Sequence, residues 1–203
     1  MRRRRHPLVL GLTGSVGMGK STAAGMLRRL GVPVHDSDAE VHRLQAKGGA
    51  ALPALAAAFP GTVRDGVLDR PALRRRVQGD EAAWRRLEAI MHPLVRRSEQ
   101  RFLARATARR EPVIVLDVPL LFETDGEQRC DATIVVSAPA FVQRARVLRR
   151  PHMTPARLAE LLARQLPDRE KRRRADFVVP TGQGHRATLR ALTKILRMAR
   201  ARC

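Results

Sequence analysis

Short apolar runs alternate with longer segments of helical spacing along this chain. Residues 8–12, 113–116 and 133–136 are apolar or β-branched runs of the length expected for buried strands. Residues 32–34 and 177–179 are briefer runs of the same kind. Strands that alternate with helices predict an α/β fold, with a parallel sheet covered by helices on both faces.

Apolar residues at helical spacing fill most of the chain between these runs. The predicted helices cover residues 20–30, 39–47, 50–59, 71–110, 139–149, 154–165, 168–174 and 188–201. The stretch 71–110 is expected to break near Gly79 and Asp80, and Pro93 is expected to bend or restart its helix. Residues 61–69 are expected to form a turn-rich connection.

Composition narrows the class of protein. The 203 residues fit one domain, and a hydrophobic content of 44% is that of a globular chain. The two cysteines, Cys130 and Cys203, exclude a disulfide framework, and no spacing resembles a zinc site. No apolar stretch approaches the roughly 18 residues of a membrane helix. The basic start resembles a signal peptide, but the apolar run after it breaks at residues 11–14, so a cytoplasmic protein is expected.

The charge is strongly basic, with 40 Lys and Arg against 19 Asp and Glu and a formal net charge of +21. Such an excess is typical of proteins that bind polyanions. Here the arginines are scattered over most predicted helices, and an aromatic content of 3% leaves few platforms for stacking bases. Compositional drift toward arginine explains the charge more simply. We therefore expect neither a nucleic-acid partner nor a membrane partner. Phosphorylated small molecules are the expected partners.

The first candidate site is a phosphate-binding loop. Residues 14–21 match the pattern G-x-x-x-x-G-K-[ST], with a predicted strand before them and a predicted helix after them. Small residues let backbone N–H groups surround a phosphate chain, and the helix N-terminus adds partial positive charge. Lys20 is expected to reach the outer phosphates, and the Ser21 hydroxyl to face Mg²⁺. The loop predicts a nucleoside triphosphate site without naming the acceptor.

Aspartates follow two of the predicted strands. Asp36 and Asp38 come after the second strand, where a carboxylate can accept a proton from an attacking hydroxyl or help to place Mg²⁺. One of them can equally cap the helix that follows. Asp117 closes the third strand, as in a Walker B motif, but a surface aspartate after a core strand is an equally good interpretation.

Three further residues are candidates on weaker signals. His92 stands on a predicted helix, where a lone histidine is more often structural than catalytic. Arg146 and Arg150 lie four residues apart, so both can project from one helical face onto a transferring phosphate as part of a lid. A solvated charged face is the simpler alternative.

These segments together resemble the dephospho-CoA kinase family, from about Leu8 to the last helix. The phosphate loop is shared by many kinases, whereas the His-Pro-Leu at residues 92–94 and the run Val-Pro-Leu-Leu-Phe-Glu at residues 118–123 are far more particular. The resemblance rests on residues 11–22, 34–38, 69–73, 87–94, 118–123, 143–150, 164–165 and 175–179.

The resemblance implies a P-loop containing nucleoside triphosphate hydrolase-like fold of the nucleoside-kinase type. It implies transfer of the ATP γ-phosphate to the ribose 3′-hydroxyl of dephospho-CoA, with ATP and Mg²⁺ at the site. It also implies a core of about residues 8–48, 111–140 and 175–203. A helical substrate-binding segment would cover about residues 50–110, and a lid about residues 141–174.

The resemblance also assigns residues to roles. Asp38 would be the base or orienting group for the 3′-hydroxyl, Arg150 a catalytic lid residue, and Ser21 a ligand of Mg²⁺. Residues that would bind dephospho-CoA are Asp38, His92, Pro119 and Leu120. Residues that would bind ATP are Gly14, Ser15, Val16, Gly17, Met18, Gly19, Lys20, Ser21, Thr22 and Arg146.

Two segments depart from the family pattern. Pro151 and His152 follow Arg150, where the family often has Asp. Residues 180–182, Pro-Thr-Gly, stand where the family often has D-N-x-G, a segment expected near the adenine.

Two other classes of protein compete with this interpretation. A P-loop kinase of the nucleoside-phosphate type would share the loop and lid, but it has no reason to carry His92-Pro93 together with residues 118–121. A basic protein that binds both nucleic acid and a nucleoside triphosphate is supported by the charge alone, and it predicts an affinity that falls steeply with salt.

Overall fold

A computed structural model describes residues 6–201 of the chain. The basic run 2–5 and Cys203 lie outside these described residues. The chain divides into two compact units, one of residues 1–35 with 105–203 and the other of residues 36–104. Each unit is built around its own hydrophobic cluster.

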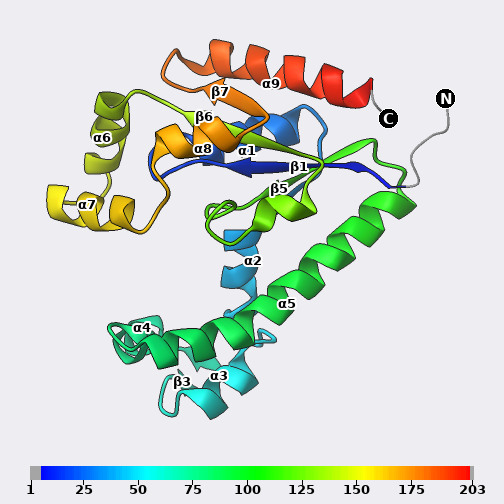
Figure 1. Cartoon of the computed structure of the whole chain (residues 1–203). Coiled ribbons are helices and arrows are strands. Elements are labelled where there is room, and N and C mark those ends of the chain that lie inside the picture. The colour runs from blue at the N-terminus through cyan, green and yellow to red at the C-terminus, as the bar shows by residue number, and fades with distance from the viewer. Residues whose placement is uncertain (1–5, 202–203) are drawn as a thin grey trace. The chain divides into compact units, whose positions relative to one another are not determined.

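The first unit is built on a five-stranded sheet with the strand order β2-β5-β1-β6-β7 (Figure 1). Its strands are β1 (Leu8–Thr13), β2 (Val34–Asp36), β5 (Val113–Asp117), β6 (Ala132–Ser137) and β7 (Phe177–Pro180). Strand β1 pairs in parallel with both β5 and β6, and β6 pairs in parallel with β7. The predicted parallel sheet of an α/β fold is therefore confirmed.

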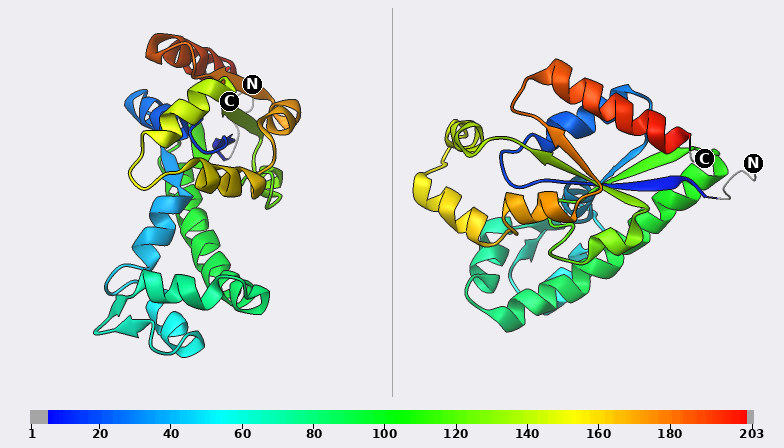
Figure 2. Two further views of the ribbon diagram at one scale, coloured as in Figure 1. Left: turned by 90° about the vertical axis from the view of Figure 1, so that its left-hand side faces the viewer. Right: turned by 45° about the horizontal axis from the view of Figure 1, so that its top comes forward.

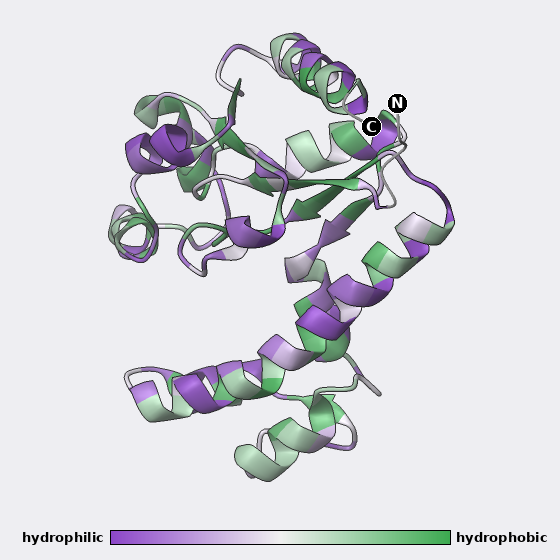
Figure 3. Cartoon of the chain, turned by 45° about the vertical axis from the view of Figure 1, so that its right-hand side comes forward, coloured by the Kyte–Doolittle hydropathy of each residue, from purple (hydrophilic) through white to green (hydrophobic). Residues whose placement is uncertain are grey.

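Helices flank this sheet. The helical elements of the first unit are α1 (Lys20–Arg29), the 3-10 helix η1 (Gly126–Arg129), α6 (Ala140–Leu148), α7 (Pro155–Ala163), α8 (Asp168–Arg174) and α9 (His185–Arg200). Helices α1 and α9 lie on one face of the sheet, and α8 lies on the other face (Figure 2). Strands β1, β5 and β6 are mostly apolar, whereas the helices mix polar and apolar residues (Figure 3).

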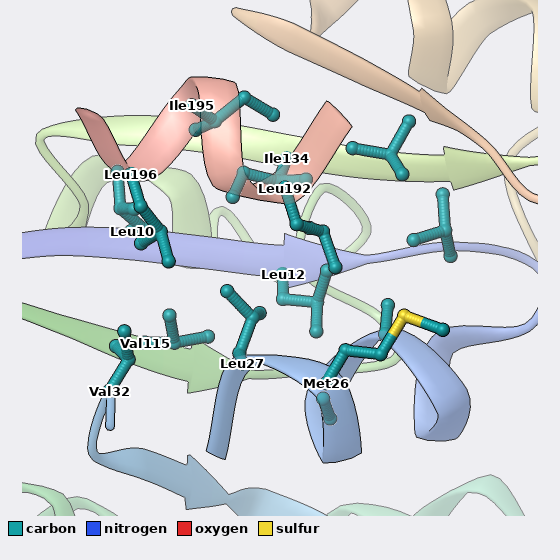
Figure 4. Packing of buried hydrophobic residues seen from close by; sticks show 14 of the residues in the cluster. Leu10, Leu12, Met26, Leu27, Val32, Val115, Ile134, Leu192, Ile195 and Leu196 are labelled. Atoms are coloured by element: carbon teal, nitrogen blue, oxygen red, sulfur yellow. The ribbon is translucent and has the colours of Figure 1, made fainter. Parts of the chain in front are cut away.

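The core of the first unit lies between the sheet and the α1 and α9 helices. Leu10 and Leu12 of β1 pack against Leu27 of α1 and against Leu192 and Leu196 of α9 (Figure 4). All five side chains are almost completely buried. Successive side chains of a strand point to opposite faces, so the alternate residues of β6 are left for the α8 side.

The second strand begins two residues later than predicted. Residues 32–34 read as an apolar run, but Val32 is a core residue whose N–H bonds to the Leu27 carbonyl at the end of α1. Ladder pairing with β5 starts at Pro33, whose carbonyl accepts from Val115 N–H at 2.9 Å. The shift moves Asp36 into the strand.

The second unit is helical with a small hairpin. Its elements are α2 (Ser37–Leu44), α3 (Leu52–Ala58), β3 (Val63–Arg64), β4 (Val67–Leu68), α4 (Arg70–Val77) and most of α5 (Glu81–Ala108). The hairpin was predicted only as a turn-rich connection. Asp65 and Gly66 both have positive φ, 52° and 72°, which is the two-residue turn that Asp-Gly favours between paired strands.

The expected break near Gly79 and Asp80 is confirmed, and α5 begins after it. Helix α4 ends before Gly79, and Asp80 accepts a hydrogen bond from Ala83 N–H at the start of α5. Pro93 was expected to bend or restart its helix, and the helix is not restarted there, since α5 continues through it. Its axis changes direction partway along (Figure 1), as expected where proline removes a backbone hydrogen bond.

Within residues 6–201, no helix has both the length and the apolar composition needed to cross a membrane.

Candidate active site

The loop between β1 and α1 needs its glycines for two physical reasons. A Cβ on Gly14 would lie 2.5 Å from the Val136 side chain and 2.8 Å from its carbonyl oxygen, so only glycine lets the loop start against β6. Gly17 and Gly19 have φ angles of 78° and 89°. Residues other than glycine adopt this left-handed backbone conformation only at a cost in free energy. The two motif glycines are therefore explained by a close approach at Gly14 and a left-handed backbone at Gly19, and Gly17 adds a second left-handed residue.

The start of α1 is suited to an anion. Gly19 is its N-cap and offers no side chain to the N–H groups of the first turn. Such uncapped N–H groups, together with the helix dipole, attract phosphate. Ser21 lies in this first turn with an exposed side chain.

Lys20 forms an ion pair with Asp117. The two side chains meet at 2.7 Å between Nζ and Oδ1, and Asp117 is only 2% exposed. Asp117 is the last residue of β5 and lies opposite Leu12 of β1 in the register, directly beside the strand that enters the loop. The alternative of a surface aspartate is wrong. Their direct pairing was not predicted.

Two glutamines hold the second variable residue of the loop. The Val16 N–H donates to Gln165 Oε1 at 3.0 Å, and the Val16 carbonyl accepts from Gln143 Nε2 at 2.8 Å. Gln143 lies in α6, and Gln165 lies just after α7. Both residues stand in segments that resemble the family, and neither had a role assigned from the sequence.

Thr181 joins the loop to the ends of β6 and β7. Its buried hydroxyl lies 2.7 Å from the Met18 carbonyl oxygen and 3.2 Å from that of Ser137. Arg146 donates to the Thr181 carbonyl at 2.7 Å and to the Gly17 carbonyl at 3.4 Å. The Pro-Thr-Gly segment that departs from the family pattern is therefore a support of the phosphate loop.

The arginine pair does not project from one helix. Arg146 is within α6, but α6 ends at Leu148, and Arg150 lies beyond it with an exposed side chain. Pro151 cannot continue the hydrogen-bond pattern of the helix, and His152 has a left-handed φ of 58°. The expectation of a shared helical face is wrong for Arg150.

The 118–123 motif forms buried polar contacts. The Pro119 carbonyl accepts from the Thr13 hydroxyl at 3.0 Å and from Lys171 Nζ at 3.4 Å, whereas the Leu120 side chain is exposed. Glu123 Oε1 pairs with Lys171 Nζ at 2.9 Å and accepts from Leu166 N–H at 2.8 Å. Lys171, which sequence analysis passed over, is completely buried.

Asp38 and His92 belong to the second unit. Asp36 caps α2 by accepting from Ala39 N–H at 2.9 Å. Asp38 is the second residue of α2 and has an exposed side chain, and His92 is exposed on α5. The cap therefore falls to Asp36, and the roles of Asp38 and His92 toward a substrate stay predictions.

The loop fits a magnesium ion that arrives with a nucleotide. Among residues 6–201, no group of three or more His, Cys, Asp or Glu side chains could hold a metal. Mg²⁺ in phosphoryl-transfer sites takes one or two protein oxygens and completes its shell with phosphates and water. The Ser21 hydroxyl and the Asp117 carboxylate are oxygens of this kind at the loop.

A phosphate loop that follows the first strand of a parallel sheet, beside a buried aspartate at a strand end, defines a P-loop fold that binds nucleoside triphosphates, and the similar structures are kinases of this fold. A crystal structure from Thermus thermophilus matches it with a TM-score of 0.85 and 37% identity over 95% of this chain and 97% of that one. A Campylobacter jejuni dephospho-CoA kinase, at TM-score 0.63 and 19% identity over 94% and 96% of the two chains, shares the fold. An Acinetobacter baumannii shikimate kinase does so at TM-score 0.51 and 19% identity, over 95% and 92%.

The chain belongs to the dephospho-CoA kinase family, whose model matches residues 8–185. It is 66% identical over 164 residues to a dephospho-CoA kinase of Paramagnetospirillum magneticum, covering 81% of this chain and 77% of the relative. It is 59% identical over 196 residues to one of Rhodospirillum rubrum, covering 96% and 92%.

The Lys20–Asp117 pair predicts a stability effect in the protein without nucleotide. Lys20→Met deprives a buried carboxylate of its cation, so the free energy of unfolding should fall by about 1–3 kcal/mol. Urea denaturation measures it. The double variant Lys20→Met with Asp117→Asn should recover part of the loss, and Lys194→Met on the exposed side of α9 is the matched control. A Lys20→Met variant as stable as that control would contradict the role of the pair.

Proposed function

We propose that this chain is an ATP-dependent phosphotransferase that phosphorylates the ribose 3′-hydroxyl of dephospho-CoA and so produces coenzyme A. The observation that carries the proposal is the family match over residues 8–185, joined to a phosphate loop with its lysine and helix N-terminus in place. The phosphate loop supports ATP as the phosphate donor, and the family match supports dephospho-CoA as the acceptor. A cytoplasmic location stays a prediction from the sequence.

The donor half of the reaction follows from the loop residues 14–22. Backbone N–H groups and Lys20 offset the negative charge of the β- and γ-phosphates. Mg²⁺ bound with the nucleotide supplies further charge neutralisation, with the Ser21 hydroxyl as its ligand. Arg146, which contacts the loop carbonyl of Gly17, would border the same nucleotide.

In the acceptor half of the reaction, Asp38 is assigned the role of the base. The 3′-hydroxyl oxygen attacks the γ-phosphorus, and its proton passes to the Asp38 carboxylate. The bond from the γ-phosphorus to the β–γ bridging oxygen breaks, and ADP leaves with the electron pair. His92, Pro119 and Leu120 would contact dephospho-CoA, with residues 50–110 as the substrate-binding segment and 141–174 as the lid.

The direct test is a comparison of acceptors. Purified protein is given Mg-ATP with dephospho-CoA, adenosine, AMP or pantothenate, and the phosphorylated products are separated by chromatography. Dephospho-CoA should be converted to coenzyme A far faster than any other acceptor is phosphorylated. Preference for AMP or adenosine would replace this proposal by a nucleoside-type kinase. Hydrolysis of ATP stimulated by DNA or RNA, without transfer to any acceptor, would instead favour a nucleic-acid protein.

Asp38 and Asp36 should differ sharply when each is changed to asparagine. Asp38→Asn removes the group that takes the hydroxyl proton, so kcat should fall by about 10²-fold or more while ATP still binds. Asp36→Asn keeps a side-chain oxygen that caps α2 as well as aspartate does, so kcat should change little. Steady-state kinetics with calorimetric ATP binding measures both. A larger loss for Asp36→Asn would reverse the assignment.

Arg150 is expected to act on charge that develops during transfer. Arg150→Ala should therefore lower kcat more than it raises the KM for ATP. Arg149→Ala is the matched control, because Arg149 is the equally exposed neighbour at the end of α6. Equal and small effects would mean that the arginines form only a solvated surface. Loss of ATP affinity with kcat intact would place Arg150 on the ground-state nucleotide.

A further inference from the structure

Val16 is the loop residue whose two backbone polar groups both bond to side chains of a distant segment. Its N–H donates to Gln165 and its carbonyl accepts from Gln143, at 3.0 Å and 2.8 Å. We call this arrangement the glutamine clamp, made of Gln143, Gln165 and the Val16 backbone. Gln143 is buried on α6, so its amide is held in place by packing.

The clamp has a consequence for the next amide of the loop. Within one planar peptide the C=O and the N–H point in opposite directions. Gln143 holds the Val16 carbonyl, so the Gly17 N–H of the same peptide points away from Gln143. That N–H makes no hydrogen bond with any residue in the described range 6–201, which leaves it as a donor for an anion. Gly17 then takes the left-handed φ that curls the loop.

A largely buried ion pair contacts the backbone next to Gln165. The next residue, Leu166, donates its N–H to Glu123 Oε1, and that same oxygen pairs with Lys171 Nζ. Apolar side chains would fill such a site at no electrostatic cost, whereas a buried charge must be paired. Besides packing, the Glu123 carboxylate provides a hydrogen-bond acceptor for the Leu166 N–H. Leu166 directly follows Gln165 of the clamp.

We propose that Gln143 and Gln165 are positioning residues for the nucleotide, which fix the peptide groups around Val16 so that the Gly17 N–H faces the phosphates, and that the Glu123–Lys171 pair holds Gln165 in register. The inference rests only on the nucleotide-binding part of the proposed function. An amide already oriented before binding avoids the entropic cost of ordering it, which favours affinity.

The polarity of the clamp gives the sharpest test. Gln165→Glu still accepts from the Val16 N–H, whereas Gln143→Glu cannot donate to the Val16 carbonyl. Both variants add the same charge. ATP binding is measured by calorimetric titration with Mg-ATP and no acceptor. The Kd for ATP should be at least about fivefold larger for Gln143→Glu than for Gln165→Glu. Equal weakening of the two would overturn the clamp.

Neutral variants separate positioning from folding. Gln143→Met and Gln165→Met should each weaken ATP binding about fivefold with a smaller change in kcat, and Gln128→Met on the exposed η1 should change neither. A purely structural role would lower Tm and leave the ATP Kd at the wild-type value, which would overturn the proposal. Since no acceptor is present in the titration, failure to phosphorylate dephospho-CoA would not affect this result.

The ion pair is tested by two double variants that both remove its charges. Lys171→Met with Glu123→Gln keeps an acceptor for the Leu166 N–H, so the ATP Kd should stay within about twofold of wild type. Lys171→Met with Glu123→Leu lacks the acceptor and should weaken ATP binding about fivefold. Equal Kd values would overturn the anchoring role. If either fails to fold, hydrogen exchange in the wild type decides, because the Val16 amide should be protected without nucleotide, and rapid exchange there would overturn the clamp.

Discussion

The parallel pairing of β1 with both β5 and β6 is the constraint on which the site depends. It brings the carboxyl ends of three strands to one edge of the sheet, which is where α/β proteins gather ligand-binding groups. The phosphate loop leaves β1 there, Asp117 ends β5, and Ser137 ends β6. Gly14 lies so close to Val136 that the first residue of the loop is fixed against β6.

Around this edge, contacts from the segment between β6 and β7 complete the loop. Gln143, Arg146 and Gln165 come from the region predicted to form a lid, and Thr181 follows β7. Their partners are backbone groups of Val16, Gly17 and Met18, so these side chains hold the loop by its peptide groups. The same region thus supports the donor site and carries Arg150, the residue proposed to act during transfer.

The parts of the fold that depend on local pattern could be predicted from the sequence. The buried strands are continuous apolar runs, and the loop motif specifies glycines with a physical need for them. The sequence was less informative where one local pattern is compatible with two different structures. Val32 belongs to the core without belonging to the strand, Pro93 bends α5 without ending it, and Asp65-Gly66 makes a hairpin from strands of only two residues each. The contacts of Lys20 with Asp117 and of Val16 with Gln165 could not be predicted from the sequence. The partners lie 97 and 149 residues away, and the topology of the sheet determines which residues meet.

The pairing of Lys20 with Asp117 affects the free energy that a phosphate gains when it binds at the loop. An ammonium group that already has a carboxylate partner does not simply gain an attraction when a phosphate arrives; it exchanges one anion for another or shares itself between them. A small anion with few contacts gains little from such an exchange. A triphosphate gains more, because it also engages the loop amides and the helix terminus. We therefore expect the loop to favour a long phosphate chain over a small anion, because Asp117 competes with the ligand for Lys20.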